Sequence, residues 1–363
     1  MEYLCQMAIE FNLSPLFLRD GIWRPEDLTK EIGMMCVGVG FVGGAAHVPS
    51  FRKVEGSKLV GLVARKGRES EAYAKKQQEK YGIEIFYDYD EALKDSRING
   101  VCVAVPTPFH YEFAEKAIKA GKHVYLEMPI TPKIEDIKKL KEMAKEAGVV
   151  VMPILNFRFQ PAYRKAKELL EAGAIGKPMC LTFREFITAK DLAGQWPLSS
   201  WAWDLKKAGG YPDYTLSVWS LDMFRWLFNT EIEETTWYPN YMEIEGIDDF
   251  KGYQTVGIIK LKNGVVGTLQ LGSSVAEGMG ESRFEIFGNN GKTIYTYWTS
   301  TVKLIGGEGE PEVWELEPKG PEVWGHKQLI QHFINVCLGK EKPIATLDDA
   351  IAAQTQANKI VKH

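Results

Sequence analysis

Long hydrophobic runs are absent from this 363-residue sequence, and no apolar stretch approaches the roughly 20 residues that a membrane-spanning helix needs. We therefore predict no membrane partner. The first residues include Glu2 and Glu10 and lack a basic segment followed by an apolar block, the pattern of a secretory signal. A cytoplasmic location is the expectation that follows.

An excess of positive charge is also missing, because the formal net charge is -4. Nucleic-acid partners usually require a basic surface, so we predict none. The five cysteines are scattered, odd in number and without close pairs. Three of them lie in apolar runs typical of strands, so we expect buried thiols in a reducing compartment. No metal site is predicted.

What remains is the composition of an ordinary globular protein, with 45% hydrophobic and 25% charged residues. The length predicts about two domains. Residues 1–33 precede the first predicted strand and are apolar enough to be an added N-terminal segment packed on the outside of the fold. The first domain is predicted over 34–154 and the second over 155–363.

The most informative motif is a Gly-x-Gly-x-x-Gly turn directly after an apolar strand, with glycines at Gly38, Gly40 and Gly43. The first glycine permits a tight turn, the second lets the backbone approach a pyrophosphate, and the third lets the next helix pack closely. That helix offers free N–H groups to the phosphates. We predict a dinucleotide site that includes these glycines with Phe41 and Val42.

Strands and helices alternate from residue 35 to residue 152. Strands are predicted at 35–39, 58–63, 84–87, 100–105, 123–126 and 149–152, and helices at 69–81, 113–120 and 134–147. Such alternation predicts an α/β domain with a parallel sheet and helices on both faces.

The pattern changes after residue 155. Helices are predicted at 161–173, 209–228, 326–338 and 347–361, and strands at 255–262, 265–272, 282–288, 292–298, 301–305 and 312–316. The Asn263-Gly264 and Asn290-Gly291 turns are typical of hairpins. The second domain is therefore predicted to be an α+β unit with an antiparallel sheet.

Several landmarks together resemble the glucose–fructose oxidoreductase, inositol dehydrogenase and rhizopine-catabolism family (Gfo/Idh/MocA). They are the glycine turn followed by His47, and the segments 105–110, 121–129, 156–161, 173–178, 201–210 and 222–227. The resemblance implies a Rossmann domain followed by a domain with a large open, mostly antiparallel sheet. It also implies a homo-oligomer (dimer or tetramer) that oxidises or reduces small molecules, mostly sugars and polyols, with NAD or NADP.

The same resemblance points to three replaced residues. The family's glutamate–lysine–proline reads Glu127-Met128-Pro129, and its aspartate and histidine fall on Thr215 and Trp219. None of the six histidines lies in the region that supplies the usual catalytic one. The glycine turn is also one residue longer than the common form, over 43–47.

The end of the second strand predicts which cofactor binds. A carboxylate about 20 residues past the glycine turn favours NAD, whereas an arginine accommodates the 2′-phosphate of NADP. The sequence has Arg65, Lys66 and Arg68 there and no carboxylate. We predict NADP, with NAD less favoured; a solvated charge run is the alternative reading. Arg65 and Lys66 are the predicted contacts.

The resemblance adds further cofactor contacts. Pro106 and Thr107 are expected beside the cofactor ribose and nicotinamide, and Glu127 at the nicotinamide ribose. Met128 can only pack against the nicotinamide ring, because a thioether carries no proton or charge. His110 is included as a contact, although a capping or packing role is equally compatible with its position.

A reaction at an alcohol carbon needs a group that takes or gives the hydroxyl proton. The candidates are Tyr211, Asp213 and Tyr214, with tyrosine favoured if its pKa is lowered; each also has a structural reading. The predicted substrate contacts lie in or near the tryptophan-rich region: Arg158, Trp201, Thr215 and Trp219.

We therefore predict an NAD(P)-dependent oxidoreductase with a non-standard proton relay that acts on a sugar-like or aromatic small molecule. A catalytically silent NAD(P)-binding sensor or scaffold is the main alternative. Elimination or hydrolysis with an internally used cofactor is a third possibility.

Overall fold

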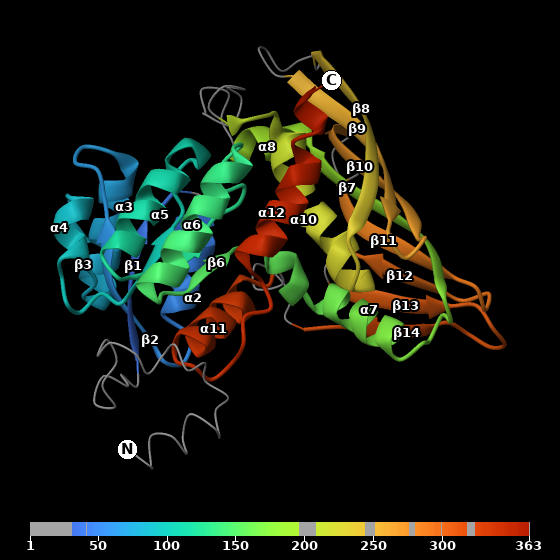
Figure 1. Cartoon of the computed structure of the whole chain (residues 1–363), viewed down its shortest axis with the longest axis horizontal. Coiled ribbons are helices and arrows are strands. Elements are labelled where there is room, and N and C mark those ends of the chain that lie inside the picture. Colours follow the sequence, from blue (N-terminus) through green and yellow to red (C-terminus); the bar gives the residue numbers. More distant parts are fainter. Residues whose placement is uncertain are drawn as a thin grey trace.

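The computed structural model describes residues 31–40, 42–195, 208–243, 251–275, 280–298, 300–317 and 324–362. Two sheets organise these residues, and several helices lie between them (Figure 1). In the described ranges, no helix is both long and apolar enough to cross a membrane. Residues 1–30, Phe41 and the segment with Trp201 lie outside the described residues.

The first sheet is parallel and has six strands in the order β3-β2-β1-β4-β5-β6. The parallel α/β prediction is confirmed. The strands β1 and β4 at its centre are fully buried because helices cover both faces. The strand bounds are β1 Ile32–Val37, β2 Ser57–Val63, β3 Glu84–Phe86, β4 Gly100–Val103, β5 His123–Leu126 and β6 Val151–Pro153.

The helices of this half follow the predicted periodicity. Helices α3 (Glu69–Tyr81) and α6 (Ile134–Ala147) have the predicted bounds. Helix α5 (His110–Lys119) begins earlier than predicted, because a 3-10 turn, η4 (Thr107–Phe109), leads directly into it. The sequence pattern missed the short helix α4 (Tyr89–Leu93).

The second sheet has eight strands in the order β14-β13-β12-β11-β7-β10-β9-β8. Among its described strand pairs, only β7 and β10 are parallel, so the mostly antiparallel prediction is confirmed. The strand bounds are β7 Pro178–Thr188, β8 Ile232–Glu243, β9 Lys251–Leu261, β10 Val266–Val275, β11 Glu281–Gly288, β12 Thr293–Tyr297, β13 Thr301–Ile305 and β14 Glu312–Glu315.

Strands β7 and β8 are absent from the predicted strand list, although both are long. Their two faces lie in different environments, and β8 carries charged and polar residues on much of its length, with the burial pattern of an edge strand. Residue type alone therefore gave a weak strand signal, and pairing with β9 and β10 decided the outcome.

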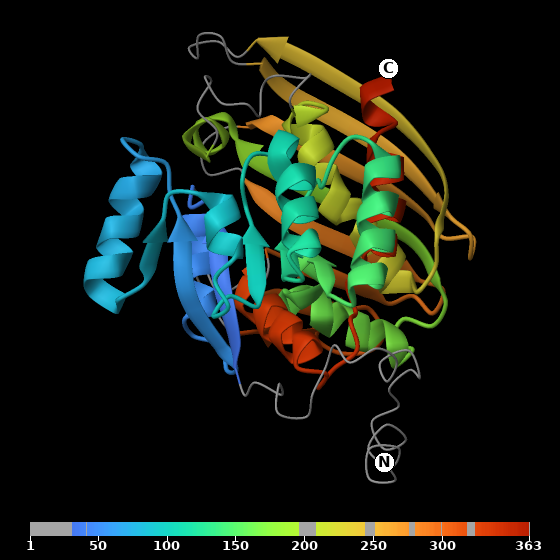
Figure 2. The same cartoon turned by 60° about the vertical axis from the view of Figure 1, so that its left-hand side comes forward.

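Helices α7 (Pro161–Glu171) and α10 (Pro212–Phe228) pack on one face of the second sheet (Figure 1). Helix α12 (Leu347–Ala357) lies between α10 and α6 and joins the two halves. Helix α11 (His326–Cys337) packs on the Rossmann half, next to the helix that follows the glycine turn (Figure 2). Helix α8 (Ala189–Gln195) follows β7.

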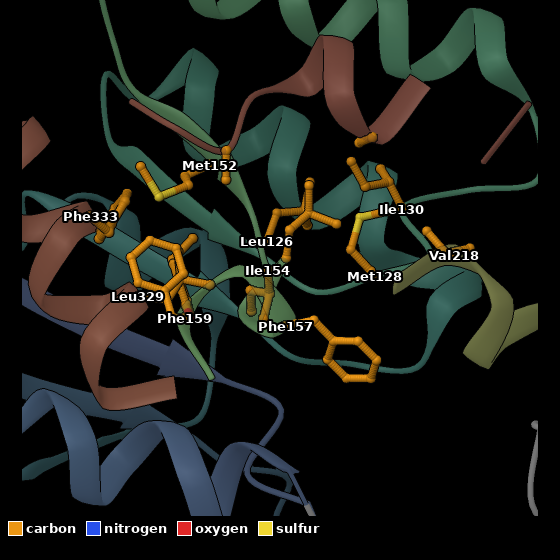
Figure 3. Packing of buried hydrophobic residues seen from close by; sticks show 14 of the residues in the cluster. Leu126, Met128, Ile130, Met152, Ile154, Phe157, Phe159, Val218, Leu329 and Phe333 are labelled. Carbon is orange, nitrogen blue, oxygen red and sulfur yellow. The ribbon is translucent and has the colours of Figure 1, made fainter. Parts of the chain in front are cut away.

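One continuous apolar cluster runs through the junction of the two halves. Figure 3 shows Leu126 and Met152 of the Rossmann half near Phe159, Leu329 and Phe333, and Met128 beside Ile130 on the side of Val218. Because side chains from both halves share this core, the ends of β5 and β6 are held rigidly against α10 and α11.

Candidate cofactor and active site

The order of the first sheet reverses between β1 and β4, so the loops after these two strands diverge at the carboxyl edge. Ligands of open α/β sheets bind in the crevice at this switch point. The loop after β1 contains Gly38, and the loop after β4 contains Pro106 and Thr107. Glu127 follows β5, the next strand along. The predicted cofactor residues of these three loops thus share one edge.

The glycine turn has the geometry of a phosphate cradle. Gly38 has a φ of 87°, and a Cβ there would lie 2.3 Å from the Ala104 carbonyl carbon. A Cβ on Gly43 would lie 2.0 Å from the Gly38 carbonyl oxygen, so neither position accepts a side chain. A Cβ on Gly40 would meet nothing within 4 Å among the described residues, which leaves open space above the backbone. This arrangement fits a pyrophosphate.

The segment that the family resemblance predicts to be one residue longer contains a single π-turn, η3 (Gly43–His47), in which the Val48 N–H donates to the Gly43 carbonyl. A π-turn contains one residue more than an α-turn and is frequent at functional sites. Helix α2 (Val48–Phe51) continues from it. The insertion is therefore absorbed within one turn, and His47 faces β5.

His47 and Glu127 form a short pair, with 2.6 Å between Nε2 and Oε1. His47 is fully buried, whereas 12% of the Glu127 side chain is exposed. Burial would raise the pKa of Glu127, but the hydrogen bond and charge of His47 outweigh it, and the pKa is lowered overall. His326 of α11 lies edge-on to His47, with 5.0 Å between ring centroids.

His110 connects two loops at the same edge. Its ring nitrogens lie 2.8 Å from the Pro129 carbonyl oxygen and 2.6 Å from that of Val105. The ring is 2% exposed, and burial lowers its pKa. These contacts favour the packing reading of His110, which fixes the loops carrying Thr107 and Glu127. Direct contact with a cofactor stays a prediction.

The turn between β2 and α3 carries the predicted cations, and the first turn of α3 carries a carboxylate, Glu71, next to them. Glu71 accepts hydrogen bonds from the Gly67 N–H at 2.6 Å and the Tyr87 hydroxyl at 3.0 Å, and pairs with Lys75. These contacts, the Gly67 bond above all, lower the pKa of Glu71 to about 2. Arg65 is exposed and Lys66 lies over the Tyr87 ring.

Met128, Thr215 and Trp219 stand where the family's lysine, aspartate and histidine are expected. Met128 is 4% exposed and belongs to the apolar cluster. The Trp219 Nε1–H donates to the Ile154 carbonyl at 2.7 Å, and its ring lies 6.4 Å from that of Phe157. Thr215 is 7% exposed, one turn before Trp219 on α10. The surroundings of Met128 and Trp219 are thus mainly apolar.

The three candidate proton donors lie at the start of α10. The buried Asp213 carboxylate accepts from Thr255 at 2.6 Å and Tyr241 at 2.9 Å, both on the second sheet. Burial raises the pKa of Asp213 and raises that of Tyr214 to about 12. Tyr211 packs on Tyr241, with 4.6 Å between centroids. A tyrosine is favoured as the proton donor only if its pKa is lowered. The pKa of Tyr214 is raised instead, so Tyr214 does not meet this condition.

Arg158 is bound within the protein. Its guanidinium contacts Asp222 at 2.6 and 2.5 Å, Asp349 at 2.9 Å and the Ile344 carbonyl oxygen. It is 5% exposed. These contacts join α10 and α12 and favour a structural role over the predicted substrate contact. Trp201, the remaining predicted contact, lies outside the described residues.

The structure thus groups the described loops with the predicted cofactor residues at one sheet edge, whereas Asp213 and Arg158 are bound to partners within the protein. His326 and Glu71 were missed. His326 is 279 positions from His47 in the chain, so only folding joins them. Glu71 was detectable as an acidic residue in the first turn of α3, close to the cationic run.

Two family models match this chain. One is described as the oxidoreductase family with an NAD-binding Rossmann fold and matches residues 32–155. The other is the C-terminal alpha/beta domain of the same oxidoreductase family and matches residues 167–362. Together these models cover both sheets.

Curated relatives include the myo-inositol 2-dehydrogenase of Thermotoga maritima, 28% identical over 75% of this chain and 77% of the relative. The 1,5-anhydro-D-fructose reductase of Ensifer adhaerens is 25% identical over 85% of this chain and 90% of that protein. The solved structure of GenD2 from gentamicin A biosynthesis in complex with NAD has a TM-score of 0.76 at 22% identity, covering 94% and 97% of the two chains. Biliverdin reductase from Synechocystis, in complex with biliverdin and NADP+, has a TM-score of 0.74 at 19% identity, covering 91% and 98%.

Proposed function

This chain belongs to the Gfo/Idh/MocA family of NAD(P)-dependent oxidoreductases, and we propose that it uses NADP to oxidise or reduce a sugar-like or aromatic small molecule with a non-standard proton relay. The observation that carries the proposal is the cradle of Gly38, Gly40 and Gly43 at the switch point of the parallel sheet. When bound, the nicotinamide cofactor supplies hydride chemistry.

The residues of this chain would bind the cofactor in three places. The glycine turn, with Phe41 and Val42, would bind the pyrophosphate through backbone N–H groups. Pro106 and Thr107 would line the nicotinamide half together with Glu127. Met128 would pack as an apolar wall against the ring.

The preference for NADP is supported by the charges of the β2–α3 turn. Glu71 already has three partners in Gly67, Lys75 and Tyr87, so its carboxylate is poorly placed to accept from a ribose hydroxyl. Arg65 and Lys66 have no ion-pair partner among the described residues and leave positive charge for a 2′-phosphate.

The substrate class is supported by the relatives and by the site surroundings. The inositol dehydrogenase and the anhydrofructose reductase act on polyol or sugar-like compounds. Phe157 and Trp219 offer aromatic faces, which stack on sugars or on flat conjugated ligands. Met128, Thr215 and Trp219 cannot replace a lysine–aspartate–histidine set as proton donors, so the proton must be exchanged elsewhere.

The function is tested by titrating purified protein with NADPH and following cofactor fluorescence. We then expect loss of the bound NADPH signal on addition of at least one member of a panel of sugars, ketones, aldehydes and conjugated compounds. Saturable NADPH binding without turnover across the panel would instead identify a silent sensor or scaffold. If neither NADP(H) nor NAD(H) binds, the oxidoreductase proposal fails.

Cofactor choice is tested by Arg65→Ala. A charge-assisted hydrogen bond contributes about 1.5–3 kcal/mol, so we expect the Kd for NADP+ to rise roughly 10- to 100-fold. The Kd for NAD+ should change little. Arg97→Ala is the control, since Arg97 lies before β4 at the opposite edge of the sheet, paired with Asp95. Equal weakening of both cofactors by Arg65→Ala would contradict the 2′-phosphate assignment.

A further inference from the structure

The His47–Glu127 pair has an unusual hydrogen-bonding balance. The 2.6 Å contact requires that His47 Nε2 carries a proton toward an ionised carboxylate. In the neutral ring the other nitrogen, Nδ1, is then a bare acceptor. That atom is buried and has no hydrogen-bond partner among the described residues. Burying a polar atom without a partner is unfavourable, and functional sites are one place where such an atom is retained.

A second imidazole lies on the same side. The His326 ring is 5.0 Å from the His47 ring at an interplanar angle of 85°, and within the part of the chain that the structure describes its buried Nδ1 also has no partner. Tyr125 of β5, two residues before Glu127, packs edge-on against His47, and none of the described residues hydrogen-bonds its hydroxyl. Two aromatic side chains with unpaired polar atoms, Tyr125 and His326, therefore pack against His47, which contacts Glu127.

Glu127 is the member of this group that reaches the cofactor edge. Its side chain is partly exposed, and its second oxygen accepts from the Met128 N–H at 3.1 Å. The carboxylate is thus fixed next to the position at which the usual lysine is replaced by a residue that cannot exchange a proton. Its orientation is set by His47 on one oxygen and by the backbone on the other.

We propose that Glu127 is the proton-exchanging catalytic residue of this site, and that His47, with His326 behind it, is the positioning residue that tunes its proton affinity. The inference rests on the proposed function. In alcohol oxidation the hydride leaves the carbinol carbon for the cofactor, the C–O bond becomes C=O, and the hydroxyl proton goes to the Glu127 carboxylate. Reduction reverses these transfers.

The groups around Glu127 are compatible with this role. His47 of η3, His110 of α5 and His326 of α11 face it and lower its pKa, against the burial that would raise it. Tyr125 of β5 and Cys102 of β4 are close enough to interact with its charge, and burial raises the pKa of both well above their ordinary values. Both therefore stay neutral near pH 7, and Glu127 is the ionised acceptor.

The test measures proton linkage of cofactor binding, which needs no substrate. Histidine ordinarily changes charge between pH 5 and 8. The nicotinamide ring of NADP+ carries a positive charge that NADPH lacks, and this charge would disfavour further positive charge in the His47–Glu127 pair, so NADP+ binding should release protons. We expect the Kd for NADP+ to fall about three- to tenfold from pH 5.5 to 8, and that for NADPH to change less. Calorimetry at pH 6.5 in two buffers of different ionisation enthalpy measures the released protons on the wild-type protein.

Three variants separate the proposal from a purely structural pair. His47→Gln and Glu127→Gln should each abolish the difference between NADP+ and NADPH in pH dependence. His332→Gln is the matched control, since His332 also lies on α11 but its Nδ1 pairs with Glu341, at 2.5 Å, and not with Glu127. The His332→Gln variant should retain the difference between NADP+ and NADPH in pH dependence. Circular dichroism and thermal melting confirm that each variant is folded.

The outcomes are distinct. If the wild type binds NADP+ without proton release, or if His47→Gln retains the full pH difference, Glu127 and His47 do not exchange the proton and the inference is overturned. If the wild type binds no nicotinamide cofactor, the proposed function itself fails. The inference is supported if His47→Gln and Glu127→Gln both lose the difference in pH dependence between NADP+ and NADPH while His332→Gln keeps it.

Discussion

At the residue scale, Glu185 of β7 is a carboxylate under helix α10. It lies on the same face of β7 as the buried Phe183, and Ser220 donates to it at 3.2 Å. Burial raises the pKa of Glu185 to about 7. Because the folded protein holds this proton more tightly than the unfolded chain does, the stability from this group is fully present below pH 4.5 and is lost as pH rises toward 7.

We predict that Glu185→Gln removes this loss of stability at high pH. The variant should be more stable than the wild type at pH 8 by about 2 kcal/mol, and the gain should vanish near pH 4.5. Urea unfolding between pH 4.5 and 8 measures the difference. The exposed Glu312→Gln provides the comparison and should show no such trend. A pH-independent difference for Glu185→Gln would mean that the carboxyl titrates normally in the folded protein.

At the element scale, the π-turn η3 explains how the chain accommodates the one additional residue that is expected after the glycine turn. The additional residue is confined to one turn, and Ala45 within it is exposed. The residues on either side of Ala45 keep the directions in which they point. Gly43 therefore packs on Gly38, and His47 contacts Glu127. An insertion in a regular helix would instead rotate all later residues by about 100°.

Deletion of Ala45 should therefore be tolerated. We expect the turn to close as an ordinary α-turn, with a stability change below about 1 kcal/mol and unchanged NADPH binding. Deletion of Glu142 from the regular helix α6 is the control. That change rotates Ala144 away from the face of Ile137 and Leu140 and should destabilise by more than about 2 kcal/mol. Thermal unfolding and NADPH titration measure both. An unfolded Ala45 deletion would refute this account of the turn.

At the scale of the whole molecule, the outer face of the second sheet carries exposed apolar side chains. Cross-strand register places Tyr238, Val256, Ile258, Val266 and Phe287 on this face, between 40 and 61% exposed. Large contiguous apolar surface is typical of interaction sites. It agrees with the homo-oligomer expected from the family resemblance, and a second copy of this chain is the partner that we expect.

We predict that the wild-type protein is a dimer or tetramer by light scattering coupled to size-exclusion chromatography. Ile258→Glu should shift it toward the monomer, because a buried unpaired charge at an interface is strongly unfavourable. Lys138→Glu on the exposed side of α6 should leave the assembly unchanged. A monomeric wild type, or an unchanged assembly of Ile258→Glu, would contradict this use of the sheet.

Many helices and strands of this protein could be predicted from local sequence patterns. Helices α3 and α6 have the predicted bounds because their apolar periodicity and glycine C-caps, Gly82 and Gly148, are local signals. Strands β7 and β8 were missed because their environment is set by distant partners. The roles of Asp213 and Arg158 could not be predicted either, because hydrogen-bond partners such as Tyr241 and Asp349 lie far away in the chain.

The sequence by itself determined the parallel sheet and the glycine turn, because these depend on residue identity and short spacing. The replacement of the usual proton donors is a prediction that rests on the same kind of local comparison. Only the tertiary structure decided which groups surround the reactive edge. The approach of His47, Glu127 and His326 depends on a π-turn, the end of a strand and a helix from the far end of the chain. Contacts between such distant segments follow from packing, which no local pattern encodes.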